Sequence, residues 1–125
     1  PHVEDFLNAA ATKLPLGILT NGNADVKKIG IDKFFKCHFT SLDVKSNKPS
    51  SKHFKKAVEF FNVLPEEILH VGDDKIADIS GCMRAGLNPL WFNNKSNEWD
   101  LDLEEPPQIS SWENALEYIE QNYEF

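Results

Sequence analysis

Short apolar runs separated by helical patterns are the feature of this sequence that most limits its fold. The runs cover 16–19, 68–71 and 89–92, and 37–40 is a further candidate strand. Strands that read as continuous apolar runs are covered on both faces, as they are in parallel sheets. The sequence therefore predicts an α/β fold in which helices flank a parallel sheet.

Helices are predicted between these strands. Apolar residues recur at helical spacing over about 2–13 and 75–86, and a shorter helix is predicted at about 24–30. Ser50 or Ser51 can cap another helix, because the residues that follow form one apolar face.

Two polar stretches are predicted to be loops, at 42–50 and 94–107. The segment Ser110-Ser111-Trp112-Glu113 has the spacing of a capping box. It predicts the start of a last helix that buries Trp112, Leu116 and Ile119.

Composition limits the kind of partner. The chain has 125 residues, enough for one small domain, and its formal net charge is −7. Nucleic acids and anionic membranes bind basic surfaces, so neither is expected as a partner. No apolar run is long enough to span a membrane. The two cysteines, Cys37 and Cys82, form no disulfide framework or metal motif, and we expect reduced thiols in a cytoplasmic protein.

Polar residues that can take part in binding or catalysis lie where the predicted strands end. In sheets of this type, ligands bind beyond the carboxyl ends of the strands. Thr20 and Asn21 follow one strand, and Asp73 and Asp74 follow another. These two strand ends are therefore the candidate site.

The acidic residues suggest a magnesium ion. Asp73 and Asp74 are adjacent carboxylates, and Asp78 lies one turn into the following helix. Mg²⁺ prefers oxygen ligands and needs few of them from the protein. The alternative is that Asp74 caps the helix and that the other two carboxylates are solvated.

Thr20 and Lys48 suggest a phosphoryl group. The Thr20 hydroxyl and the N–H groups of Asn21 and Gly22 can hold phosphoryl oxygens, unless Thr20 only stabilises a turn. Lys48 can place a point charge there, unless it is solvated, and Lys45 competes for that role.

His70, within the predicted strand 68–71, is expected to be a buried, hydrogen-bonded histidine and not a catalytic one. The other histidines, His2, His38 and His53, have no ligand spacing.

Together, these residues resemble the motifs of the haloacid dehalogenase superfamily. Leu19-Thr20-Asn21-Gly22 is similar to its second motif, Lys48-Pro49 to its third, and the segment 72–78, Gly-Asp-Asp-Lys-Ile-Ala-Asp, to its fourth. The resemblance extends over nearly the whole chain, and within the superfamily the chain most resembles the YigB-like phosphatase subgroup. The resemblance implies a Rossmann-like core domain.

The resemblance also implies roles on the substrate side. Thr20, with the amides of Asn21 and Gly22, would bind the phosphoryl group, and Lys48 would offset its charge. The substrate would be a small phosphate ester, such as flavin mononucleotide or a nucleotide.

On the metal side, the resemblance implies that Asp73 ligates Mg²⁺, with Asp74 as a second candidate. Asp78 would orient Lys48 or a metal-bound water.

The superfamily's first motif is absent. This motif is an Asp-x-Asp pair that carries the nucleophile and the acid–base group, and nothing before Thr20 supplies it. The helical cap is missing as well. We therefore expect residues 1–125 to be the C-terminal part of one core domain, inactive alone. Its central strand would come from a missing N-terminal segment or another chain, because the two inner edges would otherwise lack partners.

Three alternatives differ in class. One is a non-catalytic module that retains the phosphate and metal site. Another is a haloacid dehalogenase, which the acidic residues disfavour because those enzymes use no metal. A phospho-receiver domain would place its acidic residues before the Thr and Lys, whereas Thr20 and Lys48 here precede Asp73.

Overall fold

Parallel strands and flanking helices form the structure, a computed structural model that describes residues 2–21, 30–48 and 50–123. Every strand pairing among these residues is parallel, as predicted. Over the same residues, no helix is both long and apolar enough to cross a membrane. The strands are β1 (Gly17–Leu19), β2 (Cys37–Phe39), β3 (Leu69–Gly72), β4 (Asn88–Phe92) and β5 (Gln108–Ile109).

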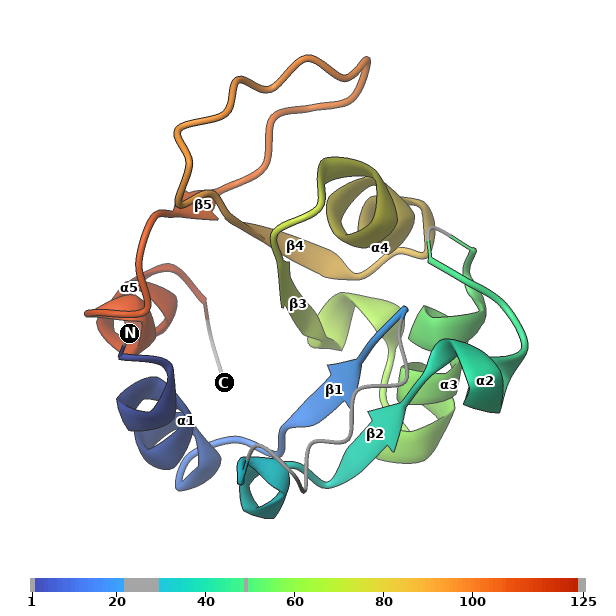
Figure 1. Ribbon diagram of the computed structural model, residues 1–125, viewed down its shortest axis with the longest axis horizontal. Helices are drawn as coiled ribbons and strands as arrows, with labels where there is room; N and C mark the ends of the chain where they lie inside the picture. The colour runs from blue at the N-terminus through green and yellow to red at the C-terminus, as the bar shows by residue number, and fades with distance from the viewer. Residues whose placement is uncertain (1, 22–29, 49, 124–125) are drawn as a thin grey trace.

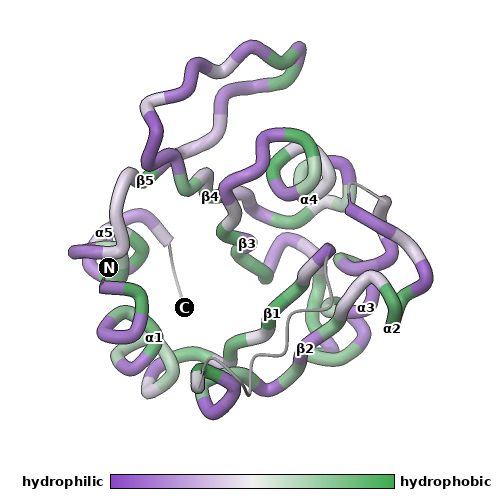
Figure 2. Tube along the Cα trace, viewed as in Figure 1, coloured by the Kyte–Doolittle hydropathy of each residue, from purple (hydrophilic) through white to green (hydrophobic). Residues whose placement is uncertain are grey.

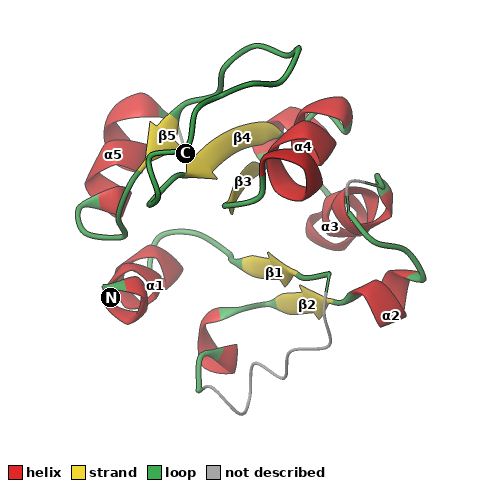
Figure 3. Ribbon diagram, turned by 45° about the horizontal axis from the view of Figure 1, so that its top comes forward, coloured by secondary structure: helices red, strands yellow, loops and turns green. Residues whose placement is uncertain are grey.

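The strands form two separate sheets. One contains β1 and β2, and the other contains β3, β4 and β5 in that order. Figures 1 and 3 show β1 and β3 at the edges by which the two sheets face each other. The sheets are therefore not joined by a hydrogen-bonded ladder between these two strands.

The facing edge of β1 carries backbone groups that do not point to β2. The Leu16 carbonyl accepts from the Lys36 N–H at 2.6 Å, and the Thr20 N–H donates to Phe39 at 3.0 Å. Backbone polar groups of successive residues point to opposite sides of a strand. Those of Leu19 therefore point away from β2.

The facing edge of β3 also carries backbone groups that point away from its neighbouring strand. The Asn88 N–H of β4 donates to the Ile68 carbonyl at 2.9 Å. By the same alternation, the backbone groups of Leu69 and Val71 point away from β4. Among the described residues, no strand pairs with these two edges, and the Leu19 carbonyl accepts from the Lys48 ammonium instead.

Side chains bridge the two sheets on one face. Phe54 of α3 (Lys52–Phe61), Cys82 of α4 (Gly81–Arg84) and Leu87 form a buried cluster. Leu19 from β1 and Ile68, next to β3, both pack against it. Apolar burial, not backbone pairing, therefore holds the sheets together here.

Aromatic contacts link the first helix to the segment that precedes the last one. Figure 1 shows α1 (Val3–Ala11) and α5 (Ala115–Asn122) side by side. Trp112 lies 4.8 Å from Phe6 and 4.7 Å from Phe92, measured between ring centroids. The stacked rings anchor α1 and the segment before α5 to the end of β4.

Several local predictions were wrong. The loop predicted at 42–50 begins with a short helix, α2 (Ser41–Val44), which the side chain of Thr40 caps. The last helix begins only at Ala115, and the Ser111 hydroxyl accepts from the Glu113 N–H at 3.0 Å without a capping box. Both errors concern polar side chains that can satisfy either a turn or a helix end.

Other segments differ in type. The helix predicted at 75–86 starts as a π-helix, η3 (Lys75–Ser80), before α4. Short helical turns occur at η1 (Asp32–Phe34) and η2 (Pro65–Glu67). The short β5 follows the 94–107 loop, which Figure 2 shows as mainly hydrophilic. The helix predicted at 24–30 lies almost wholly outside the described residues.

We expect Phe54 to contribute more than other side chains to the packing between the two sheets. Because it is completely buried, Phe54→Ala should lower the free energy of unfolding by about 3–5 kcal/mol in urea unfolding. Phe60→Ala is the matched control, since Phe60 lies on the same helix and is 49% exposed, and it should cost about 1 kcal/mol or less. Equal losses for the two variants would contradict this assignment.

Candidate active site

Side chains from three separated segments meet at the carboxyl ends of β1 and β3. The Lys48 ammonium donates to Asp78 Oδ1 and, at 3.2 Å, to the carbonyl of Leu19 in β1. Asp78 belongs to η3, which follows β3. Lys48 therefore reaches across the boundary between the two sheets, and two of the residues predicted from the sequence, Lys48 and Asp78, are in contact.

Asn21 fixes the loop that carries Lys48. Its Oδ1 accepts from the Lys48 N–H at 2.6 Å, and its Nδ2 donates to the Lys48 carbonyl at 3.1 Å. The side chain of Asn21 is therefore engaged within the protein, whereas the sequence-based prediction for a phosphoryl group concerns its backbone N–H. Gly22 and Pro49 lie outside the described residues.

The structure distinguishes the two candidate lysines. Lys48 is 9% exposed and paired with a carboxylate. Lys45 is exposed and adopts a left-handed backbone conformation, φ 58°, at the end of α2. Lys48 is therefore the lysine of the candidate site.

Asp78 is the acceptor around which the site is built. Its Oδ1 accepts from Lys48 and, at 3.2 Å, from His70 Nε2, and its Oδ2 accepts from the Asp74 N–H at 3.2 Å. Burial alone would raise the pKa of Asp78, but hydrogen bonds from His70 and Lys48 lower this pKa to about 2. The carboxylate is therefore ionised at neutral pH, and it accepts hydrogen bonds from three donors of the protein.

Glycine at position 72 makes room for this carboxylate. A Cβ placed on Gly72 would overlap the side chain of Asp78. Position 72 therefore needs a residue without a side chain, because η3 places the Asp78 side chain against the end of β3.

The two adjacent aspartates have different environments. Asp74 Oδ1 accepts from the N–H groups of Ile76 at 2.9 Å and Ala77 at 2.8 Å, so it caps η3 as the alternative interpretation foresaw. Asp73 is exposed, and its carbonyl accepts from Trp91 Nε1 at 3.1 Å. In the described part of the chain, no three His, Cys, Asp or Glu side chains converge as a metal site.

Histidines surround Thr20. The Thr20 hydroxyl lies 3.4 Å from His38 Nε2, and its carbonyl is 2.8 Å from Nε2 of His53 in α3. His53 is completely buried, and burial lowers its pKa, so the ring is neutral and its Nε2–H donates to that carbonyl. Neither contact could be read from spacing, because the three residues are far apart along the chain.

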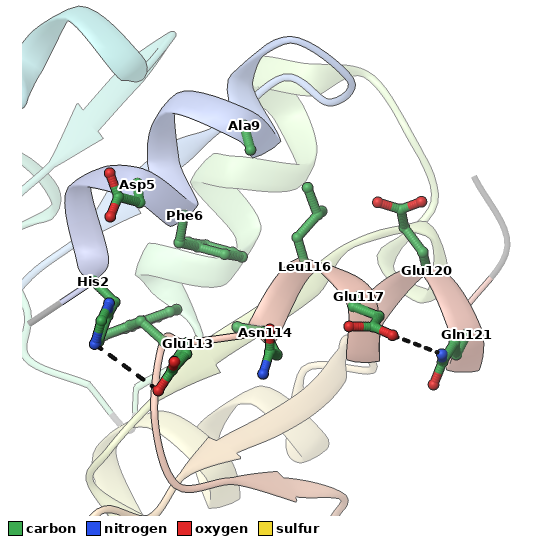
Figure 4. A pocket seen from close by; sticks show the side chains of 12 residues that line it. His2, Asp5, Phe6, Ala9, Glu113, Asn114, Leu116, Glu117, Glu120 and Gln121 are labelled. Atoms are coloured by element: carbon green, nitrogen blue, oxygen red, sulfur yellow. Dashed lines mark hydrogen bonds and ion pairs between the residues drawn. The ribbon is translucent and has the colours of Figure 1, made fainter.

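A surface groove elsewhere does not overlap this site. It lies between α1 and α5, has a volume of about 650 Å³ and has four acidic side chains among the residues that line it (Figure 4). Its lining includes His2, Asp5, Phe6, Glu113, Glu117 and Glu120. None of the residues predicted to bind phosphate or metal lines it.

Comparison with known proteins defines the family. The haloacid dehalogenase-like hydrolase family matches residues 1–92, and the chain belongs to this family. The 5-amino-6-(5-phospho-D-ribitylamino)uracil phosphatase YigB of Escherichia coli is 34% identical over 106 residues, 82% of this chain and 44% of that protein. The glyceraldehyde 3-phosphate phosphatase of Pyrococcus furiosus is 38% identical over 96 residues, 71% of this chain and 40% of that protein. The chain thus spans less than half the length of either curated relative.

Solved structures agree with this assignment. A 2-haloacid dehalogenase from Pseudomonas syringae matches with a TM-score of 0.92 and 31% identity, over 97% of this chain and 53% of that one. The hydrolase YfnB from Bacillus subtilis, solved with bound magnesium, matches with a TM-score of 0.85 and 26% identity, over 93% of this chain and 54% of that one. The predicted fold class and superfamily are confirmed.

Adding one methyl group at position 72 should damage the site. In Gly72→Ala, the new Cβ must displace Asp78, so we expect kcat of the full-length protein to fall by at least about tenfold. Gly17→Ala in β1 is the control, because its Cβ would instead meet Cys37 Sγ at 2.7 Å. Steady-state kinetics corrected for folded fraction should separate the two variants, and an equal effect of both would refute the steric role of Gly72.

The lowered pKa of Asp78 predicts an acid-dependent stability. A depressed pKa in the folded state stabilises the protein above the ordinary value of 3.8, and this contribution is lost as pH falls toward about 2. Its size is about 2 kcal/mol, from the shift in pKa. Urea unfolding between about pH 6 and pH 2 measures it.

The test variant removes both charges, because Asp78→Asn alone would leave Lys48 buried without a partner. Lys48→Met combined with Asp78→Asn should reduce the loss of stability on acidification by about 2 kcal/mol. Asp102→Asn, in the exposed loop before β5, should leave that loss unchanged. An unaltered acid dependence in the double variant would contradict the assignment.

Proposed function

We propose that this chain forms part of a magnesium-dependent phosphatase acting on small phosphorylated metabolites. The observation that carries the proposal is the buried Lys48–Asp78 pair, held beside Thr20 at the carboxyl ends of β1 and β3. A buried cation fixed next to hydroxyl and amide donors suits a dianionic phosphoryl group. The phosphatases among the relatives support this chemistry.

The described residues supply positioning and charge. The Thr20 hydroxyl and the Asn21 N–H bind phosphoryl oxygens, and the Asn21 side chain keeps the Lys48 loop in place. Asp78 holds the Lys48 ammonium at a fixed point. There the ammonium offsets the negative charge on the phosphoryl oxygens in the transition state of phosphoryl transfer.

Asp73 fits the expectation for a magnesium ligand. Mg²⁺ is usually held by one or two carboxylates together with waters and substrate phosphates, so a single exposed carboxylate at a strand end suffices on this side. When bound, the ion neutralises charge on the phosphoryl oxygens. Asp74 is the weaker candidate, because its Oδ1 caps η3.

A further strand would complete the site. In the part of the chain that the structure describes, no strand pairs with the facing edges of β1 and β3, which supports a parallel strand between them, from another segment of the protein or from another chain. Its carboxyl end would lie beside Thr20, Lys48 and Asp73, where an attacking carboxylate is needed. We infer that residues 1–125 act as one part of a core domain and are inactive without that strand.

Small phosphate esters are the proposed substrates, with flavin mononucleotide or a nucleotide as the leading candidates. The named substrates of the relatives, a phosphorylated ribitylaminouracil and glyceraldehyde 3-phosphate, are small phosphate esters. The net charge of −7 makes a polymeric nucleic acid a poor alternative.

A haloacid dehalogenase is the second candidate, because the match to a solved 2-haloacid dehalogenase covers 97% of the chain. The exposed carboxylate of Asp73 favours the phosphatase, since dehalogenation needs no metal ligand at that strand end. A non-catalytic module that binds phosphate is the remaining alternative.

The full-length protein tests the proposal. It should release phosphate from flavin mononucleotide in the presence of Mg²⁺, and this release should stop when EDTA is added. Asp73→Asn and Lys48→Ala should each lower kcat/KM by at least about 100-fold, because each removes charge stabilisation. Lys45→Ala, an exposed lysine three residues away, should change it less than about twofold.

The same preparations separate the alternatives. Chloride release from 2-chloropropionate that persists in EDTA would establish the dehalogenase. Phosphate and Mg²⁺ binding in calorimetry without turnover would establish the binding module. Phosphate release unaffected by EDTA or by Asp73→Asn would overturn the proposal.

A further inference from the structure

His70 occupies a position inside the candidate site that the proposed chemistry does not use. It lies in β3, with its side chain 12% exposed, and its Nε2 is 3.2 Å from Asp78 Oδ1. Lys48 donates to the same oxygen. A buried imidazole and the site's lysine therefore share one acceptor atom.

The chemistry of the pair fixes the state of the ring. An ionised carboxylate only accepts hydrogen bonds, so Nε2 of His70 must carry a proton to make this contact. Phe54 meets the imidazole edge-on, with ring centroids 5.0 Å apart and planes at 87°. Packing and hydrogen bonding together set the orientation of the ring.

Three donors from different segments hold the Asp78 carboxylate. Lys48 comes from the loop before α3, His70 from β3, and the Asp74 N–H from the start of η3. Lys48 lies in a loop, whereas His70 is part of a strand paired along its length with β4. Only the strand and the start of η3 therefore anchor the carboxylate independently of the lysine that it positions.

We propose that His70 is a positioning residue: its Nε2–H anchors Asp78 Oδ1 to β3, so that Asp78 holds the Lys48 ammonium at one point. The inference rests on the proposed function, because it concerns the same lysine. Without this donor, the carboxylate keeps its charge but loses an anchor that does not depend on Lys48. Lys48 then samples several positions, and the transition state loses a fixed charge.

Three substitutions in the full-length protein distinguish positioning from packing. His70→Gln places an amide N–H near the location of Nε2 and should keep kcat within about fivefold. His70→Asn, whose amide reaches only as far as Nδ1, and His70→Leu, which has no donor, should each lower kcat by about 10- to 100-fold. KM should change less than about threefold, since substrate contacts remain.

Val71→Ala is the matched control for lost packing. Val71 is the neighbour of His70 in β3 and makes no hydrogen bond from its side chain, so activity per folded molecule should stay within about threefold. A merely structural role for His70 predicts that kcat follows the loss of stability in all four variants, and rescue by Gln would then fail. That outcome overturns the proposal.

A second readout does not need turnover. In ¹⁵N NMR of the histidine rings, Nε2 of His70 should be protonated at neutral pH, with an exchange-protected proton that disappears in His70→Leu. A ring protonated only at Nδ1 would overturn the proposal even if the protein has no phosphatase activity. Inactive wild-type protein with a protonated Nε2 would instead refute the proposed function and leave the anchoring of Asp78 established.

Discussion

The ion pair between Lys48 and Asp78 is the contact on which the rest of the site depends. It joins the loop between α2 and α3 to the helix that follows β3, across two sheets with no ladder between β1 and β3. A buried ion pair adds little net stability, because desolvation offsets the attraction between the charges. Breaking one side is costly, since the other charge is left without a partner. The pair therefore acts as a constraint on geometry more than as a source of stability.

The surrounding residues extend that constraint. Asn21 clamps both backbone groups of Lys48, and Gly72 leaves the space that Asp78 occupies. Phe54 packs in the core between the sheets and also against the ring of His70. Apolar packing and the polar site are thus connected through one side chain, so damage to the core should reach the site. Such coupling is expected where residues share a contact network.

Much of the fold and of the candidate site followed from local pattern. Apolar runs predicted β1, β3 and β4, and residues 37–40 were a further candidate strand. The polar residues after the apolar runs identified Thr20, Asn21, Asp73 and Asp74 as residues at strand ends. Predictions of helix and loop were wrong where a polar side chain can stabilise either a turn or a helix end. Thr40 capped a helix in a predicted loop, and Ser111 formed a turn where a cap was expected. Periodicity also cannot distinguish a π-helix from an α-helix over so short a segment as η3.

The sequence by itself determined the α/β class, the family resemblance and the residue types at the strand ends, because these depend on spacing along the chain. Only the tertiary structure decided that Lys48 and not Lys45 is buried, and that Asp74 caps a helix while Asp78 receives three donors. It also brought His53 and His70 to the site. These outcomes depend on contacts between residues up to 33 positions apart along the chain, which form only when the chain folds.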